Sequence, residues 1–179
     1  TKNKIDNIII LKFMTVNIAL LTVTDTRTLD TDRSGAILVE KIKKANHNLI
    51  DRKICKDNKN EIVKILNQWI EKKEIDVIIT TGGTGLTGRD ITPEALNEIA
   101  DKHIPGFGEV FRYLSLETVG TSSIQSRACA VLAKGKYIFA LPGSSGGVTD
   151  AWDKILIHQL DINHKPCNFV ELFPRLKEK

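Results

Sequence analysis

The sequence predicts a single α/β domain with an open, mostly parallel sheet that carries helices on both faces. Two observations lead to this fold class. Short runs of Val, Ile and Leu, which are typical of strands buried on both faces, alternate with segments whose apolar residues recur at helical spacing. The 179 residues are also enough for one well-packed core, and the sequence has neither internal repeats nor linker-like segments.

The first half of the chain predicts three strands joined by two helices. Strands are expected at residues 16–23, 47–54 and 76–81, the second being weaker than the others. Leu38 and Ile42 lie on one face of the helix expected between the first two strands, and Asn46 ends that helix. Leu66 and Trp69 share the apolar face of the next helix, whose pattern is the clearest in the chain.

The second half predicts three helices and a pair of strands. Thr92 is the expected N-cap of the first helix, because the proline after it, Pro93, suits the first helical position. Pro105 breaks that helix, and Phe111 belongs to the next one. Residues 128–133 and 137–141 are expected to form a hairpin or a strand pair. The last helix has apolar residues in helical register between residues 148 and 156.

The charge balance and the cysteines narrow the class of partner. Lys and Arg exceed Asp and Glu by 26 to 22, and no run of basic residues forms a tail, so we expect a small anionic ligand and no nucleic acid. The three cysteines show no CxxC or Cys/His spacing, and the four histidines are scattered. We therefore expect a reducing, cytoplasmic location, with neither a disulfide framework nor a histidine-bound metal.

Residues 1–14 are expected to be an N-terminal extension of a domain that occupies residues 15–179. The apolar run at residues 8–11 is too short to span a membrane, Lys12 interrupts it, and no small-residue cleavage site follows. We therefore expect neither a signal peptide nor a transmembrane helix.

The loop after the third expected strand carries the clearest binding signal, because ligands of open α/β sheets bind beyond the carboxyl ends of the strands. It contains Thr81, Gly82, Gly83, Thr84 and Gly85. Residues 83–88 match the dinucleotide pattern GxGxxG, but the helix that should follow at once begins only near Pro93. They also match Walker A spacing, but Arg89 and Asp90 replace the required Lys and Ser/Thr. Two interpretations remain, namely a loop whose amides bind an anion and a tight turn that needs positive φ angles.

Two carboxylates near this loop each have a structural and a functional interpretation. Asp90 lies two residues before the expected N-cap and suits an Asx turn. Asp57 lies at a helix start, but Asn58 with Glu61 resembles a capping box and leaves Asp57 for another role. Together the two acids suit Mg²⁺, which takes one or two carboxylates together with waters and phosphate oxygens. Such an arrangement would serve phosphoryl or nucleotidyl transfer.

Polar residues from three other segments are further candidates. Thr24, Asp25 and Ser34 follow the first strand, and there Ser34 or Asp32 either caps the next helix or contacts a ligand. Ser126 and Arg127 suit phosphate recognition, or else they form a solvated turn with a surface charge. The last candidate segment, after the final expected strand, contains Pro142, Gly143 and Ser144.

Several blocks of the sequence resemble one family. TGGTG at residues 81–85 and RDITPEA at residues 89–95 look like the signature of the MoaB/MogA family of molybdopterin-binding proteins. The resemblance continues through PGFGE at 105–109, QSR at 125–127 and LPGS at 141–144. It covers almost all of residues 15–170, and the ending KPCNF is similar to the protein B branch of the family in particular.

The resemblance implies a three-layer αβα sandwich that assembles as a trimer, or as a hexamer built from trimers. It also implies that the chain binds molybdopterin. Active members of the family transfer an adenylyl group from Mg-ATP to the terminal phosphate of molybdopterin and release pyrophosphate. The expected partners are therefore the pterin, the nucleotide, further copies of the chain and other molybdenum cofactor enzymes.

Carried over by motif, the resemblance assigns roles to the candidate residues. Asp57 and Asp90 become the Mg²⁺-binding and catalytic acids, residues 82–85 the phosphate cradle, and Ser126 a molybdopterin contact. Thr24, Asp25 and Ser34 would line the nucleotide or pterin side. The chain departs from the family where Gly146 and Gly147 replace a proline-containing sequence that often follows LPGS. Catalytic competence varies within the protein B branch, so the alternatives are a catalytically silent subunit that binds or carries molybdopterin, and an oligomerisation scaffold.

Overall fold

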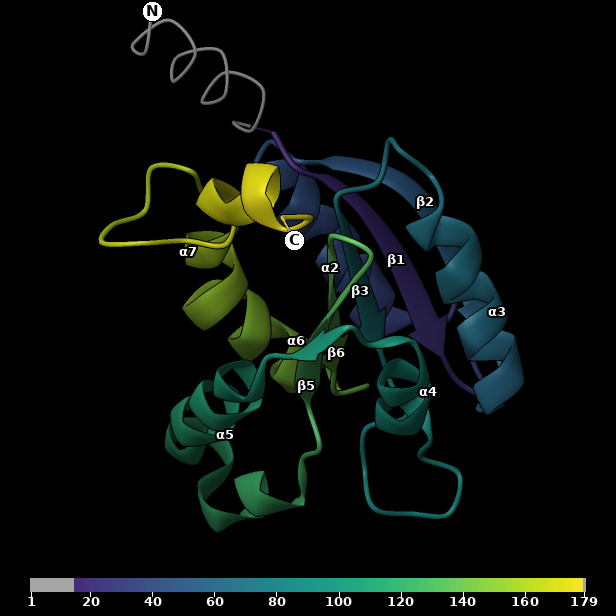
Figure 1. Ribbon diagram of the computed structural model, residues 1–179. Coiled ribbons are helices and arrows are strands. Elements are labelled where there is room, and N and C mark those ends of the chain that lie inside the picture. The colour runs from purple at the N-terminus through teal and green to yellow at the C-terminus, as the bar shows by residue number, and fades with distance from the viewer. Residues whose placement is uncertain (1–14, 179) are drawn as a thin grey trace, which may run out of the picture.

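The computed structural model describes residues 15–178, so the expected extension at residues 1–14 lies outside the described residues. Within that part of the chain, six strands form one sheet in the order β2-β1-β3-β6-β5-β4 (Figure 1). The strands are β1 (Asn17–Val23), β2 (Asn48–Cys55), β3 (Val77–Thr81), β4 (Lys102–His103), β5 (Cys129–Ala133) and β6 (Lys136–Leu141). β2, β1, β3 and β6 are parallel neighbours, whereas β5 is antiparallel to both β6 and β4. The predicted α/β class and the predicted hairpin are confirmed.

Helices cover both faces of this sheet. They are α2 (Arg33–Lys44), α3 (Lys59–Ile70), α4 (Thr92–Ile99), α5 (Pro105–Val119), α6 (Ser145–Ala151) and α7 (Ile157–Gln159). One buried cluster joins the sheet to α2, α5 and α6, and a second joins the other face to α3 and α4. Helix, sheet and helix thus form three layers, as the resemblance implied (Figure 1).

The central strand β1 shows why a continuous apolar run predicts a strand buried on both faces. Ile18 and Leu20 pack into the cluster beneath α2, and the residues between and after them, Ala19 and Leu21, pack into the cluster beneath α3. All four are fully buried. Alternate side chains of a strand point to opposite faces, so a strand with helices on both sides has no polar face.

The parallel register brings the candidate loops together at one edge of the sheet. Thr22 of β1 pairs with Thr81 of β3, and Thr81 pairs with Leu141 of β6. The amide of Gly82 then donates to the carbonyl of Leu141 at 3.0 Å. The segments that follow β1, β3 and β6 therefore start side by side at their carboxyl ends, where the sequence predicted a binding site.

The structure corrects the predicted helix start at Thr92. Ile91 occupies the N-cap position without a side-chain cap, and Thr92 is the first residue of α4. The Thr92 hydroxyl instead donates to the carbonyl of Gly82 at 2.8 Å, so it holds the glycine loop to the helix. α2 ends at Lys44 with Ala45 as its C-cap, and Asn46, which was expected to end the helix, follows with a left-handed φ of 58°.

Two further details were not visible in the sequence. β4 is only two residues long, too short to leave a periodic pattern. The last predicted helix is not a regular α-helix throughout. A π-helical turn at Trp152–Leu156 separates α6 from α7. None of the helices within residues 15–178 is both long enough and apolar enough to cross a membrane.

Candidate functional site

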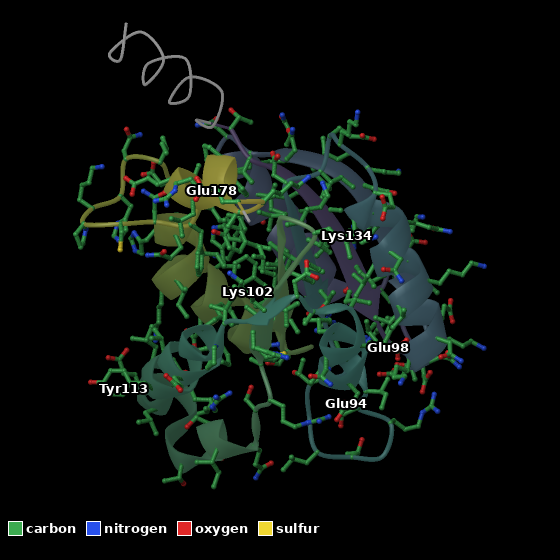
Figure 2. The ribbon with its side chains drawn as sticks, in the orientation of Figure 1. Glu94, Glu98, Lys102, Tyr113, Lys134 and Glu178 are labelled. Atoms are coloured by element: carbon green, nitrogen blue, oxygen red, sulfur yellow. The ribbon has the colours of Figure 1, made fainter. Side chains whose placement is uncertain are left out.

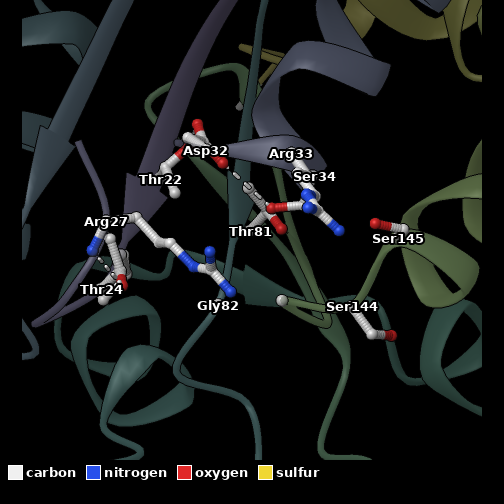
Figure 3. A pocket seen from close by; sticks show the side chains of 12 residues that line it. Thr22, Thr24, Arg27, Asp32, Arg33, Ser34, Thr81, Gly82, Ser144 and Ser145 are labelled. Carbon is white, nitrogen blue, oxygen red and sulfur yellow. Dashed lines mark hydrogen bonds between the residues drawn. The ribbon is translucent and has the colours of Figure 1, made fainter. Parts of the chain in front are cut away.

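A polar cavity of about 270 Å³ lies at the carboxyl ends of β1, β3 and β6 (Figure 3). It is lined by residues 22–24 with Arg27, residues 32–34, Thr81 with Gly82, and residues 143–145. Six of the residues expected from the sequence meet here, namely Thr24, Ser34, Thr81, Gly82, Gly143 and Ser144. They come from segments far apart in the chain, which the parallel register places together.

Asp32 anchors the α2 side of the polar cavity. Its carboxylate caps α2 by accepting from the amide of Gly35 at 2.9 Å, and it also accepts from the hydroxyl of Thr22 at 2.6 Å. Arg52 of β2 donates to the same carboxylate at 2.9 Å. Burial raises the pKa of Asp32, but these three donors outweigh it and hold the pKa below its ordinary value. Asp32 is therefore the ionised cap of α2, and the neighbouring Ser34 is left at the cavity wall.

A second, larger cavity of about 660 Å³ adjoins the first through Ser144 and Ser145; we call it the serine-lined cavity. It lies between α5 with the turn after it and the segment after β6. Its lining includes Ser115, Ser122, Ser123, Ser126, Ser144 and Ser145, together with Phe111, Val119, Pro142 and Asp150. Two more of the expected residues, Ser126 and Pro142, therefore face this cavity and not the polar cavity.

Three aspartates gather on the other side of the glycine loop and form what we call the acidic edge: Asp25, Asp57 and Asp90. Asp25 accepts the amide of Asp57 at 3.2 Å and is paired with the Arg89 guanidinium at 2.7 and 3.0 Å. Hydrogen bonding from Arg89 lowers the pKa of Asp25. None of the three lines either cavity, but Asp25 directly follows Thr24, which does.

The two predicted catalytic acids differ in their surroundings. Asp90 accepts from the hydroxyl and the amide of Thr87, and these bonds keep its pKa below the ordinary value. Burial raises the pKa of Asp57, and the charges of Asp25 and Asp90 raise it further. Among the residues described, no side-chain donor contacts the Asp57 carboxylate. Asp57 thus lies beside two other acids, and the charge of Arg89, which is paired with Asp25, offsets the rise in its pKa only in part.

One of the two hydrogen bonds of the predicted capping box is present. The Asn58 side chain accepts the amide of Glu61 at 3.1 Å and so caps α3. This leaves the carboxylate of Asp57 outside the cap, as predicted.

The glycines of the loop are required by the protein's own backbone. Gly82 and Gly83 have φ angles of 101° and 66°, in the left-handed region that favours glycine. A Cβ on Gly82 would lie 2.1 Å from the carbonyl oxygen of Val23, and one on Gly85 would lie 2.7 Å from a carboxylate oxygen of Asp90. The tight-turn interpretation therefore holds for this loop, and anion binding by its amides stays a prediction.

Arg127 is not the solvated surface charge of one of its two sequence interpretations. Its guanidinium donates to the carbonyls of Gly85 at 2.7 Å and Asp90 at 2.8 Å, and it pairs with Glu94. Its amide donates to the carbonyl of Thr84 at 2.9 Å. Arg127 therefore fastens the glycine loop to α4. It also lines a third cavity together with Arg112 and Ser126, so phosphate recognition by Arg127 stays a prediction.

Six residues that line the polar cavity were not assigned to the site from the sequence, namely Thr22, Val23, Arg27, Asp32, Arg33 and Ser145. Arg27 and Arg33 lie in the segment between β1 and α2 that was already expected at the binding edge. Their positive charge in a segment expected to bind an anion could have identified them as site residues. No group of three or more His, Cys, Asp and Glu within residues 15–178 is arranged to hold a metal ion, so a bound cation would need ligands from a substrate as well.

Comparison with known proteins identifies the family to which the chain belongs. A family model described as "Probable molybdopterin binding domain" matches residues 19–162. Molybdenum cofactor biosynthesis protein B of Escherichia coli K12 is 43% identical over 167 residues, which are 93% of this chain and 96% of that protein.

Solved structures agree with the sequence comparison. A crystal structure of molybdenum cofactor biosynthesis protein B has a TM-score of 0.79 at 42% identity and covers 82% of this chain and 91% of that one. The tungsten cofactor synthesizing protein MoaB from Pyrococcus furiosus has a TM-score of 0.71 at 35% identity and covers 79% and 91%. The chain therefore belongs to the molybdopterin-binding-domain family that includes molybdenum cofactor biosynthesis protein B.

Proposed function

We propose that this chain acts in molybdenum cofactor biosynthesis, where it binds molybdopterin and adenylylates its terminal phosphate with Mg-ATP. One observation supports the proposal above the others. The polar cavity and the acidic edge meet at the glycine loop, with Gly82 in the cavity and Gly83 beside Asp57. A pocket for an anion thus adjoins carboxylates for a cation, as transfer between two phosphate groups requires.

The two adjoining cavities suit the two parts of a phosphorylated pterin. The polar cavity is small and carries hydroxyls, guanidinium groups and backbone of the glycine loop, which suit a phosphate. The serine-lined cavity has apolar walls from Phe111, Val119 and Pro142 for a flat ring, and hydroxyls for its polar edge. Ser144 and Ser145 lie at the junction of the two cavities.

The residues at the acidic edge fit Mg²⁺. Burial raises the pKa of Asp57, and the charges of Asp25 and Asp90 raise it further. The charge of Arg89 offsets this only in part, so a bound cation would stabilise the ionised carboxylate. Asp57 and Asp90 would hold the ion, with phosphate oxygens and water as the other ligands. The bound ion would supply charge that stabilises the reacting phosphates.

In this reaction the main role of the protein is to position two anions, the terminal phosphate of molybdopterin and ATP. An oxygen of the terminal phosphate of molybdopterin forms a bond to the α-phosphorus of ATP, and the bond from that phosphorus to the β-phosphate oxygen breaks and releases pyrophosphate. A phosphate monoester is largely a dianion at neutral pH, since its second pKa is about 6, so no side chain must remove a proton. The arginines and hydroxyls of the polar cavity would orient the phosphate, and Asp57 and Asp90 would orient the cation.

One assay separates this proposal from its alternatives. The protein is incubated with molybdopterin, ATP and Mg²⁺, and adenylylated molybdopterin and pyrophosphate are expected in equal amounts. Molybdopterin binding without either product would instead identify a catalytically silent carrier. Failure to bind the pterin or phosphate would leave the oligomerisation scaffold.

Self-association is part of the proposal, and the surface of α5 supports it. Val110, Tyr113, Leu116, Val119 and Ile124 are exposed on α5 and the turn after it, and Tyr113 points away from the fold (Figure 2). Several exposed apolar side chains on one helix and the turn after it favour an interface. Light scattering is expected to give three or six times the chain mass of 20.0 kDa, and a monomer would contradict this part of the proposal.

A further inference from the structure

We propose that Arg27 and Arg33 form a phosphate-binding subsite in the polar cavity, separate from the cation site at the acidic edge. The group bound there is a phosphate monoester or a diphosphate. The proposal rests on the proposed function only for the molecule that carries this group. The subsite itself follows from the contacts and charges of the described residues.

The first step is a difference among the arginines. The sequence contains seven, all within residues 15–178. Arg52, Arg89, Arg127 and Arg175 pair with carboxylates, and Arg112 donates to the carbonyls of Ser126 and Ala128. Within the same part of the chain, the guanidinium groups of Arg27 and Arg33 have no hydrogen-bond or ion-pair partner. These two arginines are also the two that line the polar cavity.

The second step is the charge of the cavity. Asp32 is the one carboxylate among its lining residues. That carboxylate is already occupied, because it accepts from Thr22, Ser34, Gly35 and Arg52. With Arg52 offsetting Asp32, the charges of Arg27 and Arg33 remain uncompensated. A small cavity with two uncompensated guanidinium groups attracts an anion of charge about −2, which is that of a phosphate monoester near neutral pH.

The third step is the donor geometry. The Arg27 side chain extends from the loop after β1 toward Gly82, and Arg33 enters from the start of α2 (Figure 3). Ser144 and Ser145 line the same cavity and add hydroxyl donors, whereas the hydroxyl of Ser34 already donates to Asp32. A guanidinium presents its N–H groups as a rigid fork that matches two oxygens of a phosphate, so two forks and several hydroxyls can satisfy a tetrahedral anion.

The position of the subsite explains how an anion and a cation can both bind beside the glycine loop. The arginines lie on the Gly82 side of the glycine loop, and Asp57 and Asp90 lie on the Gly83 and Gly85 side. Were the acids to line the same cavity, they would pair with Arg27 and Arg33 and cancel their charge. Arg89 shows this outcome, because Asp25 already neutralises it.

The experiment measures pyrophosphate and inorganic phosphate binding by isothermal titration calorimetry without divalent cations, so that the acidic edge cannot contribute. The variants are Arg27→Gln, Arg33→Gln and the double substitution, with Arg175→Gln as the matched control on an exposed pair outside the site. Each single variant is expected to weaken pyrophosphate binding roughly tenfold, the loss typical of one charged hydrogen-bonding partner. The control is expected to bind as the unmodified protein does. Circular dichroism verifies that all variants are folded.

Two results would overturn the subsite. The first is an unmodified protein that binds neither probe at millimolar concentration. The second is a double variant that binds pyrophosphate as tightly as the control, which is what two merely solvated arginines would give.

Further titrations identify the source of the phosphate. Weakened AMP binding in the double variant, with unchanged molybdopterin binding, assigns the subsite to the nucleotide, and the reverse pattern assigns it to the pterin. Loss of pyrophosphate binding in the variants of a protein that forms no adenylylated product would support the subsite and contradict the proposed function. The two proposals therefore fail independently.

Discussion

The carboxylate of Asp90 accepts two hydrogen bonds from Thr87, one from its amide at 2.9 Å and one from its hydroxyl at 2.6 Å. The same carboxylate occupies the space that a Cβ on Gly85 would need. Asp90 thus closes the end of the glycine loop through bonds to a residue three positions earlier, and not through the Asx turn that the sequence predicted. Because Thr87 lowers its pKa, Asp90 also stays ionised at neutral pH. A structural and a functional role of this residue are therefore compatible.

Replacing Asp90 by Asn separates its charge from its hydrogen bonds. Asn has nearly the same shape and can still accept from Thr87, so the loop should keep its conformation. We expect the rate of adenylylation to fall by about 100-fold, as for loss of a metal-site carboxylate, while the molybdopterin Kd changes less than about threefold. Pyrophosphate release and pterin fluorescence titration measure the two quantities.

Thr87→Val is the control for that prediction, because it removes the hydroxyl donor and leaves the Asp90 charge. Its rate should fall by less than about tenfold, the effect of one hydrogen bond. If Thr87→Val is as inactive as Asp90→Asn, Asp90 acts only by shaping the loop.

Asp57→Asn is expected to stabilise the protein while it removes a ligand for Mg²⁺. Burial and the charges of Asp25 and Asp90 raise the pKa of Asp57, so its ionised form costs stability at neutral pH. In the absence of Mg²⁺ we expect the variant to have a Tm about 1–3 °C higher. Added Mg²⁺ should raise the Tm of the unmodified protein and leave that of the variant unchanged. Equal Mg²⁺-induced shifts in both proteins would argue against a cation at Asp57.

The elements that were predictable from the sequence are those with a local cause. The run at β1 is apolar on both faces because helices cover both faces, and the Asn58 cap needs only the amide three residues later. Parallel strands then place the loops after β1, β3 and β6 together, which is why the candidate residues were found at one edge. β4 has two residues and no such local signal.

The partners of the charged side chains were not predictable. Arg27, Arg89 and Arg127 look alike in the sequence, yet one lines the polar cavity, one neutralises Asp25 and one fastens the glycine loop. Arg127 and Gly85 are 42 residues apart in sequence, and they meet because the segment before β5 lies against the glycine loop. Whether a given charge is available to a ligand depends on such distant partners.

Arg127 provides a direct test of how the loop is held. Arg127→Gln removes donors to the carbonyls of Gly85 and Asp90 and breaks the pair with Glu94. We expect a loss of about 2–3 kcal/mol in the free energy of unfolding, because two partly buried carbonyls lose a charged donor. Urea denaturation measures this loss.

Arg127→Lys keeps the charge but not the planar fork, so we expect it to recover less than half of that stability. Full recovery would show that charge alone fastens the loop. Arg175→Gln, which breaks an exposed pair with Glu178, should cost at most about 0.5 kcal/mol and serves as the control.

The buried pair of Asp32 and Arg52 predicts how stability depends on pH. Donors from Thr22, Gly35 and Arg52 outweigh burial and hold the folded-state pKa of Asp32 below its ordinary value of 3.8. A lowered pKa means that the ionised form is favoured by folding. Its contribution is therefore fully present above pH 3.8 and is lost as the pH falls through the lower, folded-state pKa.

Asp32→Asn is accordingly expected to lower the free energy of unfolding by about 2 kcal/mol at pH 7, because Arg52 loses its ionic partner. The difference between variant and unmodified protein should shrink as the pH is lowered from 4 toward 2, and urea denaturation at each pH measures it. Asp153→Asn, which breaks the more exposed pair with Lys41, should cost about 0.5 kcal/mol or less at pH 7. If the Asp32→Asn difference stays constant with pH, Asp32 stabilises the start of α2 through hydrogen bonds alone, and its charge is not what holds the wall of the polar cavity in place.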